Sequence, residues 1–261
     1  MFFGFSGEFF KGSIVSSSLG VIKSWLAMLV AAFLLTGCLG GSDGGTAATS
    51  ISGVAATGLP MAGTVELVDA NGETSDPATI GAGGAFEIDT TGLTAPFILR
   101  ATGSGGSAGT VLYSLADGTT GTFNITPLTH LALELIRQEL GEAPADLAGL
   151  FSGWNAQFDS GDLAALQTTL QQMQSRINAN LRTQMEANGL TVETYDFLRT
   201  AFAANSAGID AVLDAITITF NGNEIIIGEG EGSTPFNIEI DISGFNIGGG
   251  SGGGTVTGGS A

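Results

Sequence analysis

The sequence predicts an α+β protein with an N-terminal antiparallel β-sandwich, a small helical region and a C-terminal β-hairpin or meander. Three observations lead to this class. Short runs rich in β-branched residues alternate with turn residues through positions 51–126. Apolar residues recur at steps of three and four through positions 127–216, which is the spacing of one helix face. Asn221 and Gly222 separate two β-branched runs within positions 217–247, which is a strong hairpin signal.

The first region is expected to hold short strands at positions 51–56, 64–68, 85–89, 96–101, 110–115 and 122–125. Phe86 and Ile88 alternate with polar neighbours, as they would on the buried face of a strand. Asp69, Asn71 and Gly72 favour a hairpin-like turn after the second strand. Several short strands with regular turns indicate a sandwich.

The helical region is expected to contain helices at positions 127–140, 160–188, 192–204 and 209–216. Thr126 can cap the first helix, and Pro127 suits its first position. The second carries one long apolar stripe and ends at a glycine. Tyr195, Leu198 and Phe202 would share one side of the third.

The C-terminal region is expected to continue beyond the hairpin. Ile238, Ile240 and Ile242 alternate with Glu239 and Asp241, which predicts a strand at positions 236–242. This strand would either join the first sheet or cover the helices. The glycine-rich positions 248–261 predict a disordered tail.

The charge balance excludes one class of partner. The chain has 25 acidic residues and 7 basic ones, so its formal net charge is −18. Lys11 and Lys23 precede position 38, and the remaining basic residues are arginines. Such a chain repels phosphate backbones, so we expect no nucleic-acid partner. It also has no polybasic patch for anionic lipids, so membrane attachment would need another device.

Positions 1–37 have the layout of an export leader. Lys23 precedes an apolar run at positions 25–35, which is too short to cross a bilayer core of about 30 Å as a helix. The run ends in Leu35, Thr36, Gly37 and Cys38, and Cys38 is the only cysteine. No internal disulfide can therefore form. The alternative is a free cysteine buried in a retained anchor helix.

This ending resembles the lipobox of bacterial lipoproteins. The resemblance implies that the Cys38 thiol receives a diacylglyceryl group, with palmitate as a typical chain, and that cleavage occurs just before Cys38. Positions 38–50 would then be the lipidated cysteine and a flexible tether. The resemblance implies a cell-envelope protein held on the membrane by its lipid. Leu39, which is not aspartate, favours the outer membrane.

A second resemblance covers about 50 residues of the 51–126 region. A Gly-x-Pro turn, an Asn-Gly turn and a Gly-x-Phe motif precede a closing aliphatic strand. This pattern looks like a carboxypeptidase-regulatory-like domain, which implies a prealbumin-like sandwich without peptidase activity. The chain departs from the pattern at Ser75, Asp76 and Pro77, which interrupt the usual strand. The matching residues are Gly58, Pro60, Gly63, Val65, Leu67, Gly72, Gly84, Phe86, Leu99 and Ala101.

No candidate residue forms a convincing catalytic set. His130 is the only histidine, so it lacks the partners that a metal or catalytic site needs, and we expect a structural or solvent-facing role. Asp210 and Asp214 lie one turn apart on an expected helix, opposite its apolar side. We interpret them as solvated surface, because paired acid–base chemistry needs a cleft.

Two other groups have a structural and a binding interpretation. Asp69, Asn71 and Glu73 lie in one turn and could bind calcium weakly, but an Asx turn explains them better. A group of aromatic side chains could form a platform for sugars, but such rings more often pack a small core. These aromatic residues are Phe151, Trp154 and Phe158.

The leading expectation is a non-catalytic, membrane-anchored surface or periplasmic lipoprotein that serves structure, adhesion or partner binding. It would need no cofactor and no metal, and its partner would be a protein or a glycan. The first alternative is a carbohydrate-binding lipoprotein. The second, which the sequence favours least, is a hydrolase.

Overall fold

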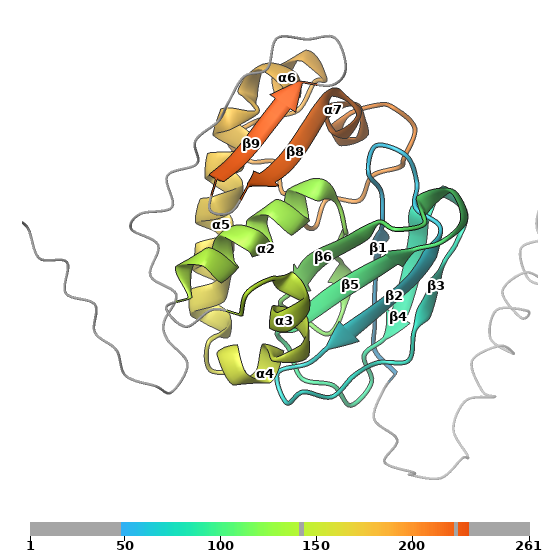
Figure 1. Cartoon of the computed structure of the whole chain (residues 1–261), viewed down its shortest axis with the longest axis vertical. Coiled ribbons are helices and arrows are strands. Elements are labelled where there is room, and N and C mark those ends of the chain that lie inside the picture. Colours follow the sequence, from blue (N-terminus) through green and yellow to red (C-terminus); the bar gives the residue numbers. More distant parts are fainter. Residues whose placement is uncertain (1–47, 141–143, 222–223, 230–261) are drawn as a thin grey trace, which may run out of the picture. The chain divides into compact units, whose positions relative to one another are not determined.

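The computed structural model describes residues 48–140, 144–221 and 224–229 (Figure 1). All of them belong to the unit Thr46–Ala261. Strands and helices are both present, and nearly all described strand pairs are antiparallel, so the α+β class is confirmed. None of the helices in these ranges is both long and apolar enough to cross a membrane.

The first sheet contains β1 (Ser50–Val54), β4 (Ala85–Asp89) and β7 (Gly121–Thr122) in the order β4-β1-β7. β1 is antiparallel to β4 but parallel to β7. The expectation of an entirely antiparallel region is therefore wrong for this pair. The whole chain between β1 and β7 provides the long crossover that a parallel pair requires.

The second sheet contains β2 (Gly63–Val68), β3 (Ala78–Ile80), β5 (Phe97–Gly103) and β6 (Val111–Ala116) in the antiparallel order β3-β2-β5-β6. The sequence missed β3 because residues 75–77 resemble a break. Ser75 instead holds the chain beside β2, since its Oγ accepts a hydrogen bond from Leu67 N at 3.1 Å. Short 3₁₀ turns lie at Ala82–Gly84 and Gly105–Ser107.

The strand β1 begins earlier than its sequence pattern indicates. Ser50 pairs with Asp89, so the expected tether, positions 38–50, is wrong at its C-terminal end. Thr49 is also fixed, because Thr90 N donates to its carbonyl at 2.9 Å and its own N–H donates to Thr91 Oγ1 at 3.0 Å. The chain therefore enters the fold at Thr49.

The first helix is α2 (Pro127–Glu139), as predicted. Thr126 Oγ1 accepts from Thr129 N at 3.3 Å, and Thr129 Oγ1 accepts from Thr126 N at 2.8 Å. These reciprocal bonds satisfy two backbone donors that the helix itself leaves free. Two short helices that the sequence did not reveal follow, α3 (Leu147–Ser152) and α4 (Trp154–Gln157).

The expected helix at positions 160–188 is two helices, α5 (Leu163–Asn180) and α6 (Arg182–Ala187). Its apolar stripe was correct, since Leu166, Met173, Ile177 and Met185 are fully buried. Leu181, also fully buried, joins the helices with φ −93° and ψ 14°, which ends regular helix geometry there.

The expected third helix, at positions 192–204, is wrong: the structure shows turns there. Asn124 and Asn178 bind backbone carbonyls that a helix would have used. The fourth helix is α7 (Ile209–Ala215), as predicted, and the hairpin is β8 (Ile216–Asn221) with β9 (Glu224–Glu229). The expected strand at 236–242 and the tail at 248–261 lie outside the described residues.

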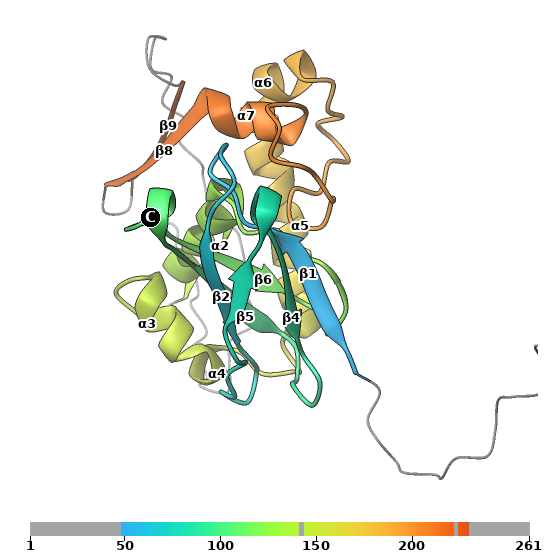
Figure 2. The same cartoon turned by 90° about the vertical axis from the view of Figure 1, so that its right-hand side faces the viewer.

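One hydrophobic core connects the strands and helices of the described ranges. It contains β-sheet residues such as Ile51 and Leu99 together with helical residues such as Leu131 and Ile177. In Figure 1 the first and second sheets lie to the right of α2 and α5, and in Figure 2 they lie in front of these helices. The β region and the helical region are therefore packed on each other and not joined only by a linker.

Candidate functional site

The anchor residues predicted from the sequence lie outside the described residues. These are Leu35, Thr36, Gly37 and Cys38. The structure therefore bears on the remaining candidates, which are distributed over the folded body.

His130 has a structural environment on α2. Its Nδ1 accepts a hydrogen bond from the backbone N–H of Tyr113 at 3.3 Å. Burial lowers the pKa of His130 from 6.5 to about 4, although the nearby Glu134 carboxylate acts in the opposite direction. The imidazole is consequently neutral at pH 7, which suits an acceptor in the packed region between α2 and β6.

The interpretation of Asp210 and Asp214 as a solvated pair is wrong for Asp210. Asp210 has no exposed surface, whereas Asp214 is exposed. The turn before α7, with positive φ at Ser206 and Gly208, directs the Ser206 N–H to Asp210 Oδ2 at 2.7 Å. This turn covers the first turn of α7, so Asp210 lies beneath it. Asp210 Oδ1 has no hydrogen-bond partner.

Asp69 forms the expected Asx turn. Its Oδ1 accepts from the backbone N–H groups of Asn71 and Glu73, both at 2.8 Å. Its Oδ2 accepts from Thr94 N at 2.9 Å, which links the turn to the segment before β5. The buried carboxylate thus accepts from three backbone N–H groups and from the Asn71 side-chain amide, which explains the residue without calcium.

The three candidate aromatic residues pack in the core, which was the structural interpretation of these rings. Trp154 is fully buried, Phe158 is 1% exposed and Phe151 is 6% exposed. Trp154 Nε1 donates to Pro96 O at 2.8 Å, so its polar group is also satisfied internally. The hypothesis that these rings form a sugar-stacking platform is therefore wrong.

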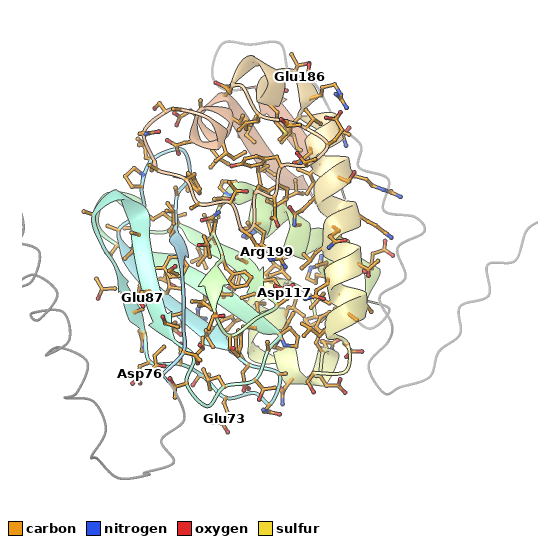
Figure 3. All side chains as sticks on the ribbon, turned by 180° about the vertical axis from the view of Figure 1, so that it is seen from behind. Glu73, Asp76, Glu87, Asp117, Glu186 and Arg199 are labelled. Atoms are coloured by element: carbon orange, nitrogen blue, oxygen red, sulfur yellow. The ribbon has the colours of Figure 1, made fainter. Side chains whose placement is uncertain are left out.

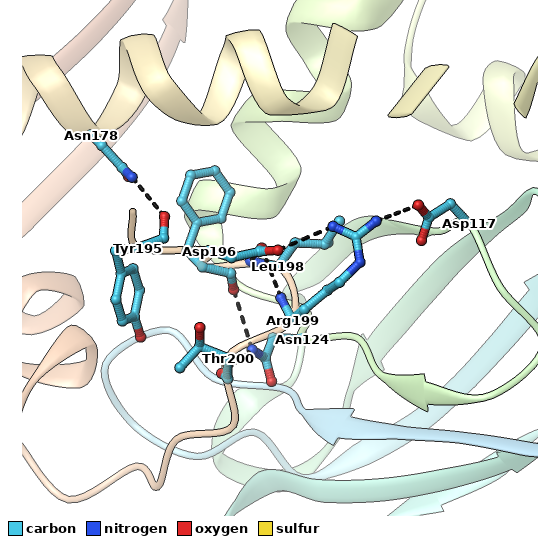
Figure 4. Close-up of polar contacts among 9 residues, drawn as sticks. Asp117, Asn124, Asn178, Tyr195, Asp196, Leu198, Arg199 and Thr200 are labelled. Atoms are coloured by element: carbon cyan, nitrogen blue, oxygen red, sulfur yellow. Dashed lines mark hydrogen bonds and ion pairs between the residues drawn. The ribbon is translucent and has the colours of Figure 1, made fainter. Parts of the chain in front are cut away.

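A partly buried cluster that the sequence did not reveal connects the β region to the helices (Figure 4). We call it the polar junction, and it consists of Asp117, Asn124, Asn178, Asp196 and Arg199. Arg199 binds Asp117 through Nη2 and Asp196 through Nη1, the latter at 3.1 Å. Figure 3 places Asp117 and Arg199 close together within the body. Because its members lie far apart in the chain, no sequence motif marks the junction.

The Asp117 carboxylate is ionised because Arg199 is beside it. Burial alone would raise the pKa of Asp117, but the hydrogen bond and charge of Arg199, together with a hydrogen bond from Gln167, outweigh it, so the pKa lies below its ordinary value of 3.8. The Arg199 guanidinium also lies 5.6 Å from the centre of the Phe123 ring. Arg199 is thus held by two carboxylates and an aromatic face.

Asn124 uses its backbone and side chain to join three segments. Its Oδ1 accepts from Val54 N at 3.3 Å, and its carbonyl accepts from Ser114 Oγ at 2.6 Å. Its Nδ2 donates to Phe197 O at 3.2 Å and to Thr200 O at 2.8 Å. The one sequence signal of this role is that Asn124 stands between two apolar residues, Phe123 and Ile125. A polar side chain that is buried beside them needs hydrogen-bond partners.

The outer face of the second sheet is covered by helices at one end only. Val68, Ile98 and Leu115 form a cross-strand row beneath α2 and α3 and are at most 4% exposed. The next row on this face contains Glu66 and Arg100, which are half-buried and joined by a 2.8 Å ion pair. The Arg100 guanidinium lies 4.3 Å from the Phe151 ring centre.

The last row on this face is open to solvent, and we call it the open row. It runs across all four strands, since Thr79 pairs with Thr64, Thr64 with Thr102 and Thr102 with Val111. Thr79, Thr102 and Val111 are exposed, and Thr64 is partly exposed. Val111 and Leu59 are the large hydrophobic residues that the described part exposes most, at 40% and 73%. The open row therefore provides an uncharged surface for contact.

No protein family, curated protein or solved structure matches the chain. Within the described ranges, the two features that stand out are the polar junction and the open row.

Proposed function

We propose that this chain is a non-catalytic lipoprotein of the bacterial cell envelope, held on the membrane by lipid on Cys38. Its folded body would serve structure, adhesion or partner binding. The outer membrane is the proposed location, because Leu39 follows the lipidated cysteine.

The observation that carries this proposal is the sequence Leu35-Thr36-Gly37-Cys38 at the end of an apolar run. The structure supports it indirectly, because the chain enters the fold at Thr49, soon after Cys38. The intervening segment, rich in glycine, would act as a tether. Two or more acyl chains give stable anchoring, which a basic patch would otherwise have to provide.

We also propose that the two sheets form the prealbumin-like sandwich of the carboxypeptidase-regulatory-like family. Two glycines of the family pattern support this. Gly63 has φ +145°, and a Cβ there would lie 1.9 Å from Thr102 O; Gly84 has φ +79°, and its Cβ would lie 2.4 Å from Ala55 O. Both positions therefore require glycine for backbone reasons that match the turns of the pattern.

A role without catalysis is supported by what the candidate side chains do. His130, Asp69 and Trp154 all contribute to internal hydrogen bonds. Arg100, Arg137, Arg182 and Arg199 all form ion pairs with carboxylates of the same chain, and Arg176 also has a partner. Anionic partners therefore find no spare cation among these arginines, whereas the uncharged open row offers a contact surface.

Replacing Cys38 with alanine tests the anchor. The variant should remain as uncleaved precursor and incorporate no labelled palmitate, because both reactions of the lipoprotein pathway require the thiol. Metabolic labelling and intact mass measure these two results. Wild-type protein should gain acyl mass and lose positions 1–37.

A Ser42→Ala variant is the matched control, because it changes the proposed tether without touching Cys38. It should be cleaved and acylated like the wild type. Normal cleavage and labelling of the Cys38→Ala variant would show that the N-terminal assignment is wrong.

A further inference from the structure

Residues 191–204, which we call the strap, have a helix-like sequence in a non-helical conformation. They contain no glycine or proline, and Tyr195, Leu198 and Phe202 have helical spacing. The structure nevertheless contains only two separate turns with i to i−4 bonds. Tyr195 N donates to Thr191 O at 3.0 Å, and Thr200 N donates to Asp196 O at 2.8 Å. The helical ladder is interrupted between Tyr195 and Asp196.

Two asparagines occupy carbonyl groups that a continuous helix would use. Asn178 Nδ2, from α5, donates to Val192 O at 3.1 Å and to Tyr195 O at 2.7 Å. In a continuous helix these carbonyls would accept from the N–H groups four residues later. Side-chain bonds to the backbone therefore replace the helical ladder in the first half of the strap.

Asn124, from the segment after β7, acts on the second half in the same way. Its Nδ2 binds the carbonyls of Phe197 and Thr200, and its backbone N–H donates to Leu198 O at 2.7 Å. The strap is thus clamped from two directions, by α5 on one side and by the β region on the other (Figure 4).

Asp196 stabilises the interruption itself. Its Oδ1 accepts from the N–H groups of Leu198 and Arg199, both at 3.0 Å, which is how a capping residue begins a new turn. In a continuous helix these two N–H groups would bond to the carbonyls of Thr194 and Tyr195. Asp196 therefore competes directly with the helix at the point where it breaks.

The clamped conformation leaves one polar atom unsatisfied and depends on polar contacts. Asn178 Oδ1 is buried without a hydrogen-bond partner. Phe197 and Leu198, neighbours in the chain, are both 2% exposed, whereas a helix would direct them about 100° apart. The two conformations thus differ in hydrogen bonding and in which apolar side chains are buried.

We propose that the strap is a two-state conformational element. It forms two clamped turns while Asn124, Asn178 and Asp196 hold its backbone, and it becomes a continuous helix when this hold is weakened. Because Asn124 belongs to the β region and Asn178 to α5, the state of the strap depends on how these two parts engage it. The rearrangement breaks and forms no covalent bond.

Replacing Asp196 with alanine in the full-length chain tests the proposal. Loss of the cap should let the helix continue, so the amides of the strap should exchange with solvent about tenfold more slowly. Far-UV circular dichroism should show a gain of helix in the same sample. Hydrogen-exchange mass spectrometry of peptides from 191–204 measures the first effect.

Asp196→Asn is the matched control, because asparagine keeps the capping oxygen and removes only the charge. It should retain wild-type exchange. Adding Ala201→Gly to the Asp196→Ala variant should reverse the slowing, because glycine disfavours helix. Asn178→Ala should also slow exchange of the strap amides, because the carbonyls of Val192 and Tyr195 would then be free to accept helical hydrogen bonds. Unchanged or faster exchange of the strap in both alanine variants would overturn the proposal, since the three side chains would then only hold a loop.

Discussion

Replacing Arg199 with methionine should lower the free energy of unfolding by about 3 kcal/mol at pH 7. The Asp117 side chain is 6% exposed and would lose the guanidinium that neutralises it. An unpaired carboxylate in that position is costly, because water cannot replace the lost partner. Methionine keeps much of the length and can still contact Phe123, so most of the loss should be electrostatic. Urea unfolding of the two proteins measures the difference.

A second substitution separates charge from packing. In the Arg199→Met/Asp117→Asn protein, the buried carboxylate is absent, so most of the lost stability should return. If the double variant is as unstable as Arg199→Met, then Arg199 acts through packing and the electrostatic explanation is wrong.

The pH dependence of the same pair gives a further check. Arg199 holds the pKa of Asp117 below 3.8, so the pair stabilises the native state fully above that value and loses its effect as the pH falls through the folded pKa. In Arg199→Met, burial is opposed only by the remaining hydrogen bonds, including the one from Gln167, and the pKa of Asp117 should rise. The deficit of this variant relative to wild type should therefore shrink as the solution is acidified.

The parts of the fold that the sequence predicted well depend on neighbours in the chain. Thr126 and Pro127 start α2 through contacts within its own first turn. The hairpin signal around Asn221 correctly predicted that β8 pairs with β9, although Asn221 itself is the last residue of β8 and pairs with Glu224. Each of these signals is local, so no knowledge of the remaining fold was needed to interpret it.

The strap shows where local patterns fail. Its spacing of Tyr195, Leu198 and Phe202 indicates a helix, but Asn124 and Asn178 lie far away in the sequence and bind its carbonyls. Long-range hydrogen bonds of this kind override local preference. The polar junction was missed for the same reason, since only the fold brings its members together.

Asp210 illustrates a different failure. Helical periodicity predicted that it lies opposite the apolar side of α7, but Asp210 is buried like the apolar residues of this helix, because periodicity identifies only which residues share a face. The preceding turn covers that face at Asp210 and leaves Asp214 exposed. Whether a polar helix position is solvated therefore depended on a loop whose path has no simple sequence signature.

His130 should make the protein less stable in mild acid. Its pKa falls from 6.5 to about 4 on folding, chiefly because of burial. Between these values the unfolded chain binds the proton more tightly, so stability decreases as the pH falls from 6.5 to 4. A pKa difference of this size corresponds to a loss of about 3 kcal/mol in the free energy of unfolding between pH 7 and pH 4. Protonation would also prevent Nδ1 from accepting the Tyr113 N–H.

The His130→Asn variant isolates this contribution from the carboxylates that titrate in the same range. Asparagine can offer Oδ1 to the Tyr113 N–H but cannot gain a proton in this pH range. Above pH 7 the variant should be somewhat less stable than wild type, because the smaller side chain packs less well. On acidification the wild type should lose its advantage and become the less stable protein near pH 4. Chemical unfolding at several pH values measures both curves, and parallel curves would mean that His130 does not change its proton affinity on folding.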